Sequence, residues 1–363
     1  MVTISPSEPL LAEAAFDAMT TATYMNGDLV ATSLLDHIDS SYLDAGNRGE
    51  VAASLLLLLA RDKAVKAPDR QDILPLGKRS MDPKNDGWTS GRIITALDFL
   101  RALLPSDHHR SLGQHKPSCH VEGKDGETLE EAFTDGFIWF NHFIKVNDFS
   151  MVNRQYLSCL ISRGAAIICA DNHRGVDLVI PVLFNDSLEP ESVSAILIQV
   201  KNDASFTHNV CTALFDLMDP YEVNLFSKGE TPSPITRLVF ALASKRADVM
   251  FPSPGCRSNR YVSNDKYTAY DIWVAGVTPE SFGVISQDSV QTYNSLLQRS
   301  INAFNGYGLF DHSSKEQVLR DGRTSARRRM HPGASSILEH QQNYVAFDSG
   351  QSPCVELDDN EEE

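Results

Sequence analysis

The sequence predicts an α/β fold, with a central mixed sheet of four to five strands flanked by helices on both faces. The main observation is an alternation between residues 151 and 304. Segments with apolar residues at helical spacing take turns there with short, apolar runs that are rich in β-branched residues. The second observation is size: 363 residues, 42% of them hydrophobic, suffice for a large buried core.

The front of the chain is predicted to be helical. Residues 1–45 carry apolar residues at roughly helical spacing, and residues 46–49 (GNRG) predict a turn. The following run, Glu50 to Ala64, is apolar nearly all round and predicts a buried helix. Glu50 has two interpretations: a carboxylate that interacts with the helix dipole, or an acid close to a metal on a helix beside a catalytic sheet.

Residues 67–150 have the composition of a large insertion within a main domain that runs from residue 46 to residue 310. One helix is predicted in it, Gly91–Leu104. Possible metal ligands follow that helix, but their spacing matches no zinc pattern, so we expect a solvated loop. These ligands are Asp107, His108, His109, His115, Cys119 and His120.

Residues 129–150 form an aromatic run that includes Phe137, Trp139, Phe143 and Phe149. Core packing is the favoured interpretation, and a surface on which nucleic-acid bases stack is the alternative.

The remaining elements follow in chain order. Helices are predicted over Met151–Arg163, which Gly164 ends, and over Phe206–Met218 and Val290–Phe304. Strands are predicted over Ala165–Ala170, Val176–Phe184, Ala195–Val200, Ile235–Ala243 and Asp271–Val277.

Charge and cysteine content limit the choice of function. The net charge of −16 opposes a nucleic-acid partner, but residues 151–335 carry 18 basic and 18 acidic side chains and are neutral. Residues 311–363 predict a largely disordered tail, basic at Arg323 and Arg327–Arg329 and acidic at its end. Six scattered cysteines, no apolar run long enough for a bilayer and no secretory signal lead us to expect an intracellular protein of the nucleus or cytoplasm.

Three polar residues interrupt the two apolar runs within residues 175–203. Gln199 and Lys201 are two apart at the end of one predicted strand, so their side chains share a face. A hairpin-like connection would bring Asp177 beside them. Asp177, the Gln199 amide oxygen and the Val200 carbonyl oxygen are suitable ligands for Mg²⁺ or Mn²⁺, and Lys201 could hold a phosphate oxygen or activate water. Alternatively, Asp177 accepts hydrogen bonds from the turn at residues 172–175, and Gln199–Lys201 is an ordinary strand end.

The segments GVDLVIPV and ILIQVKN resemble the PD-(D/E)xK superfamily of restriction-endonuclease-like nucleases. That family has a core helix followed by three strands, with an Asp on the second strand and a Glu-x-Lys at the end of the third. The resemblance implies that Asp177 and Lys201 match the Asp and Lys, and that Gln199 takes the place of the Glu, as in Mrr-type nucleases. It also implies a metal-proximal role for Glu50, although the helix 151–163, which lacks an acid, is an equal candidate for the core helix.

The segments FNHFIKV, GVDLVIPV and ILIQVKND further resemble a group of mushroom proteins, and this second resemblance implies no function. The nuclease resemblance implies metal-dependent hydrolysis of phosphodiester bonds in nucleic acid, with DNA as the expected substrate. The alternative is a nuclease-fold module that has lost catalysis and acts in protein or nucleic-acid interactions. No phosphate-binding loop, GxSxG elbow or HExxH helix offers another chemistry.

Overall fold

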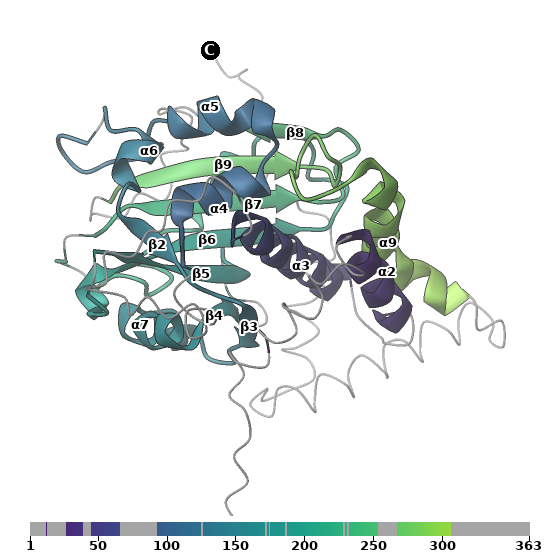
Figure 1. Ribbon diagram of the computed structural model, residues 1–363, viewed down its shortest axis with the longest axis horizontal. Helices are drawn as coiled ribbons and strands as arrows, with labels where there is room; N and C mark the ends of the chain where they lie inside the picture. Colours follow the sequence, from purple (N-terminus) through teal and green to yellow (C-terminus); the bar gives the residue numbers. More distant parts are fainter. Residues whose placement is uncertain are drawn as a thin grey trace, which may run out of the picture. The chain divides into compact units, whose positions relative to one another are not determined.

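The computed structural model describes residues 12, 27–38, 45–65, 93–124, 126–170, 173, 175–185, 187–227, 229–230, 232–252 and 267–305 (Figure 1). The predicted disordered tail, the basic cluster and most of the predicted N-terminal helical segment lie outside these residues. The chain divides into a compact unit that ends at Gln298 and a second unit that begins at Arg299.

The helices of the described residues are α2 Gly27–Ile38, α3 Ala45–Val65, α4 Ala96–Leu103, α5 His109–Gly113, α6 Leu129–Ala132, α7 Arg154–Arg163, α8 Thr212–Asp216 and α9 Val290–Asn305. The strands are β1 Ile94–Thr95, β2 Gly136–Ile138, β3 His142–Lys145, β4 Ala165–Ile168, β5 Leu178–Phe184, β6 Val193–Lys201, β7 Ile235–Ala241, β8 Asp248–Met250 and β9 Ala269–Ala275. Short 3₁₀ turns are η1 Ser106–His108, η2 Phe149–Met151, η3 Pro190–Ser192 and η4 Gln287–Ser289. None of the helices in these ranges is long and apolar enough to cross a membrane.

The strands form one mixed sheet in the order β1-β2-β5-β6-β7-β9-β8, in which β4 also pairs with β5 and β3 pairs with β4. β4, β5 and β6 are antiparallel neighbours, whereas β6, β7 and β9 run parallel. The α/β class is confirmed, but the predicted strand number of four to five is wrong, because the sheet has nine strands within the described residues alone. The additional strands β1, β2, β3 and β8 have only two to four residues, which is too short for a visible periodic pattern.

The two faces of the sheet are covered by different helices. Alternate residues of β6 enter different clusters: Ile196 and Ile198 pack with α3 and α4, whereas Ala195 and Leu197 pack with α7 and α8. Figure 1 shows α3 and α4 crossing one face of the sheet, with α7 beside β4. Side chains on odd-numbered positions of β6, including Gln199 and Lys201, therefore belong to the α7 and α8 face.

Helix α3 begins at Ala45, so the turn predicted at residues 46–49 is wrong. Gly49 serves close packing instead of a turn. A Cβ atom on Gly49 would lie 3.0 Å from Asn202 Cβ and 3.1 Å from Val200 Cγ1. Glycine therefore allows the start of α3 to pack directly against the end of β6.

Much of the predicted insertion is part of the sheet. Residues 93–150 supply β1, β2 and β3. The solvated loop expected around the histidines is wrong for His115, which is buried against the rings of Phe251 and Tyr270. Backbone hydrogen bonds that join Ser118 and Cys119 to Ala269 of β9 hold this segment against the sheet.

Helix α8 is shorter than the predicted helix Phe206–Met218. Polar side chains bind nearby backbone N–H groups in the preceding loop: Asp203 Oδ1 accepts from Ser205 N at 2.7 Å, and Thr207 Oγ1 accepts from Asn209 N at 3.2 Å. These local bonds compete with helix formation. The scattered cysteines gave no pairing pattern, but Cys211, which precedes α8, is disulfide-bonded, whereas Cys119, Cys159 and Cys169 form no disulfide bond.

Candidate active site

The candidate site lies at the edge of the sheet where β6 ends and β5 begins. Asp177 directly precedes β5, and its backbone joins two neighbouring segments. Its N–H donates to Ile198 O at 2.9 Å, and its carbonyl accepts from Cys169 N at 2.8 Å. Gly175, with φ +83°, allows the chain to turn into this position. The Asp177 backbone is therefore fixed from both sides.

The Asp177 carboxylate accepts a hydrogen bond from the Val200 N–H, at 2.6 Å from Oδ2. Burial raises the pKa of this carboxyl, and the Lys201 ammonium and the Val200 N–H oppose that rise. In an extended strand the N–H and C=O of one residue point to the same side, so the Val200 carbonyl also faces the Asp177 side of β6.

The Lys201 side chain lies on the same face of the sheet as Gln199, and its charge interacts with that of Asp177. Burial lowers the pKa of its ammonium, and the negative charges of Asp177 and Asp203 oppose this shift. Its Nζ lies 5.6 Å from the centre of the Phe206 ring, at cation–π distance. Lys201 is thus held between an acid and an aromatic ring.

Gln199 is buried, with only 4% of its surface exposed, and its Oε1 atom has no hydrogen-bond partner within the described structure. A buried acceptor without a partner costs about 1–3 kcal/mol. The last paired position of the hairpin is Leu178 opposite Ile198, and Asp177 also donates its N–H to Ile198 O, so Gln199 is the first residue of β6 beyond the paired positions. This amide oxygen is therefore available to a cation, and the next residue of the strand, Val200, binds the Asp177 carboxylate.

Glu50 belongs to α3, which packs on the face of the sheet opposite to the one that carries Gln199. It lies in the second turn of α3, because the helix begins five residues earlier, and the helix-dipole interpretation of this acid is therefore wrong. The neighbouring Gly49 packs on Val200 and Asn202. Burial raises the pKa of the Cys169 thiol, and the charges of Asp177 and Glu50 raise it further. Both carboxylates thus act on one buried thiol.

Cys169 is the site residue that the sequence did not single out. It reads as a small core residue, and it is indeed only 3% exposed. Its place directly after β4, the strand antiparallel to β5, is the only signal that could have indicated its proximity to Asp177.

The candidate cation donors at this edge are oxygen atoms. No group of three His, Cys, Asp or Glu side chains in the described ranges could hold a metal ion. The available protein donors are therefore few: the Asp177 carboxylate, the orphaned Gln199 oxygen, the Val200 carbonyl and Glu50. Mg²⁺ and Mn²⁺ prefer oxygen ligands, and Mg²⁺ commonly uses one or two carboxylates and water.

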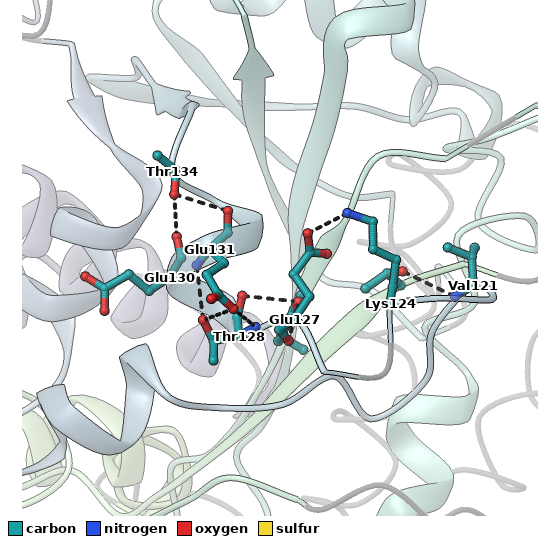
Figure 2. A network of polar contacts seen from close by, with 9 residues as sticks. Val121, Lys124, Glu127, Thr128, Glu130, Glu131 and Thr134 are labelled. Atoms are coloured by element: carbon teal, nitrogen blue, oxygen red, sulfur yellow. Dashed lines mark hydrogen bonds and ion pairs between the residues drawn. The ribbon is translucent and has the colours of Figure 1, made fainter.

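The carboxylates of a second acidic cluster, at residues 127–131, already have hydrogen-bond or ion-pair partners within the protein (Figure 2). Glu131 bonds both the N–H and the hydroxyl of Thr128 in the capping box of α6. Glu127 pairs with Lys124, and Glu130 pairs with Arg101 at 3.0 Å. These carboxylates stabilise local structure and leave the β5–β6 edge as the better candidate for a cation.

Comparison with known proteins adds no relative: no family model, curated protein or solved structure matches this chain.

Proposed function

We propose that this protein is a metal-dependent nuclease that hydrolyses phosphodiester bonds of nucleic acid, with DNA as the substrate. The observation that carries the proposal is the buried Gln199 Oε1, which lacks a hydrogen-bond donor, on the same strand end as Lys201, whose charge interacts with Asp177. A buried acceptor and two partly buried charges at one strand edge are costly, and a bound cation would offset that cost.

The order of elements supports a nuclease-like core. Helix α7 directly precedes β4, and β4, β5 and β6 form an antiparallel meander. This order is similar to the helix and three strands of the PD-(D/E)xK family, with Asp177 at the start of the second strand and Lys201 at the end of the third. Because α7 carries no acid, Glu50 of α3 is the carboxylate that would complete the site.

Each residue then has a defined role. Asp177, Gln199, the Val200 carbonyl and Glu50 would hold Mg²⁺ or Mn²⁺, which supplies charge stabilisation and a more acidic water when bound. The Val200 N–H keeps the Asp177 carboxylate in place. Burial lowers the pKa of Lys201, so its Nζ is suited to accept a proton from the attacking water or to hold a phosphate oxygen.

Exposed cations at the same edge of the sheet support a phosphate-rich partner. β6 and β7 are parallel and in register, with Lys201 opposite Ala241, so the turn after β7 lies at the edge where Lys201 lies. That turn exposes Lys245 and Arg246. Contacts of this kind fix a nucleic-acid backbone without reading its sequence.

The test is cleavage of supercoiled plasmid by the purified chain with Mg²⁺ or Mn²⁺, next to the variants Asp177→Asn and Lys201→Ala. We expect nicked and linear products from the parent chain only. If all three preparations cut equally, or if none cuts although each is folded by circular dichroism, the catalytic proposal fails.

One observation favours the second candidate, a nuclease-fold module without catalysis. The site offers a neutral Gln199 where the family has a glutamate, and no three-ligand group of acids, histidines or cysteines forms within the described ranges. This candidate predicts that Mn²⁺ does not raise the melting temperature of the chain, whereas a metal-binding nuclease is stabilised.

A further inference from the structure

An aromatic side chain lies uncovered close to the candidate site. Phe149, the first residue of η2, is 48% exposed and is one of only two large hydrophobic side chains exposed in the described ranges. The other members of the aromatic run, including Trp139 and Phe143, are at least partly covered. An exposed aromatic ring leaves apolar surface in water that a ligand could cover.

The ring is held in a fixed position. Asp148 caps η2, and its Oδ1 accepts from Ser150 N at 2.9 Å, so its carboxylate is engaged in its own turn. The Phe149 ring lies 5.2 Å from the His173 ring, centre to centre, at an interplanar angle of 48°. His173 supports one side of the ring, and about half of the side chain remains accessible.

His173 connects this ring to Asp177. Its backbone N–H donates to Ala170 O at 3.0 Å, and its Nδ1 donates to the Val176 carbonyl oxygen at 3.2 Å. Val176 adjoins Asp177 in the chain. In addition, β3 and β4 are parallel, so both end at the same edge of the sheet. The segment that leads to Phe149 leaves the sheet there, where Cys169, the residue after β4, hydrogen-bonds to Asp177.

Aromatic rings therefore flank the site on both sides. Phe149 and His173 lie on the β4 side, and Phe206 lies over Lys201 on the β6 side. Of these, Phe149 is the exposed one. A flat exposed ring beside a phosphate-handling site suits a stacked nucleobase, because every base has a π-face.

We propose that Phe149 is a stacking platform for an unpaired nucleobase next to the scissile phosphate, and that His173 positions its ring. The protein would then act on nucleic acid with a single-stranded or unpaired segment in preference to a continuous duplex. This inference rests on the proposed nuclease function for the chemistry of the ligand.

The test is binding without divalent cations, so that no cleavage is needed for the readout. The probes are a single-stranded oligonucleotide that carries 2-aminopurine and the corresponding duplex. The variants are Phe149→Ala, Phe149→Leu, which keeps apolar surface without a π-face, and Phe149→Trp. Leu188→Ala is the matched control, because Leu188 is 51% exposed in the β5–β6 connection, at the far end of the hairpin from Asp177.

We expect the parent chain to bind the single strand more tightly than the duplex and to quench 2-aminopurine. Phe149→Ala and Phe149→Leu should weaken single-strand binding about tenfold, whereas Phe149→Trp and Leu188→Ala should leave it near the parent value. Equal binding by the parent, Phe149→Ala and Phe149→Leu chains would overturn the proposal, as would equal affinity for single strand and duplex.

The two proposals fail in different ways. If plasmid is not cleaved but single-strand binding depends on Phe149, the nuclease proposal fails and the platform stands. If plasmid is cleaved and the Phe149 variants keep the parent KM on a single-stranded substrate, the platform fails and the nuclease proposal stands.

Discussion

A glutamate in place of Gln199 would restore a charge that the proposed metal site lacks. Gln199→Glu keeps the side-chain length and places a carboxylate in a buried position of β6, next to Val200, whose N–H binds Asp177 on the neighbouring segment. Cross-strand neighbours have Cβ atoms about 5 Å apart. Two like charges at that separation repel by about 3 kcal/mol at an effective dielectric constant of about 20.

Without metal, Gln199→Glu should therefore lose about 3 kcal/mol of unfolding free energy. The repulsion raises the folded-state pKa of the introduced carboxyl above its unfolded value of about 4.3. The folded state then binds more protons, so the loss is absent below about pH 4, grows as the pH rises and is complete above the raised pKa. With metal the same charge becomes a ligand, and affinity for Mn²⁺ should rise about a hundredfold.

Gln199→Met is the counterpart, since it removes the orphaned oxygen at similar volume. It should raise the free energy of unfolding by about 1–2 kcal/mol and abolish any response to Mn²⁺. Gln155→Glu, at an exposed position of α7, is the charge control and should change stability by less than about 0.5 kcal/mol.

The assay is urea unfolding and thermal melting of each chain, with and without Mn²⁺, at pH 8. The reasoning is refuted if Gln199→Glu and Gln155→Glu behave alike, or if Gln199→Met destabilises the metal-free chain as much as Gln199→Glu does. In either case Gln199 does not face a charged, oxygen-lined site.

Three further outcomes are expected. Gly175→Ala should lower the free energy of unfolding, measured in urea, by at least about 2 kcal/mol, because φ is +83° and a Cβ atom would lie 2.1 Å from a backbone oxygen. Gly126→Ala is the control and should leave it unchanged, because the space around Gly126 is open. Asp271→Ala should cost about 3–5 kcal/mol, seen as a lower urea midpoint, because it leaves Arg237 buried without the carboxylate that now lies 2.6 Å away. If Lys201 accepts a proton, the single-turnover cleavage rate should rise with pH through the lowered pKa of Lys201. Lys201→Arg stays charged and should remove that rise. A pH profile that Lys201→Arg leaves unchanged would limit Lys201 to an electrostatic role.

The long, buried elements could be predicted from the sequence because periodicity and burial agree in them. The strands β5, β6, β7 and β9 and the helix α7 lie where runs of apolar, β-branched or helically spaced residues predict them. Gly164 also ends α7 as expected, with φ +63°. Wherever one element buries a whole face, its own sequence carries the signal.

Elements that depend on distant partners could not be predicted. β1 has two residues, and it exists because β2 pairs with it. His115 lies in a polar stretch, yet it is buried by Phe251 and Tyr270, which are far away in the chain. No local pattern encodes such contacts.

The candidate site, like the fold, could be predicted from the sequence only in part. The sequence by itself determined that Gln199 and Lys201 share one face, because side chains alternate along a strand. Only the tertiary structure decided that the Val200 N–H binds Asp177, that Gly49 brings Glu50 to the same edge, and that Gln199 Oε1 is left without a donor. The physical reason is that burial, desolvation and hydrogen-bond satisfaction depend on which surfaces of the protein meet. The pairing of strands across the sheet determines which surfaces meet, and no local sequence pattern encodes that pairing.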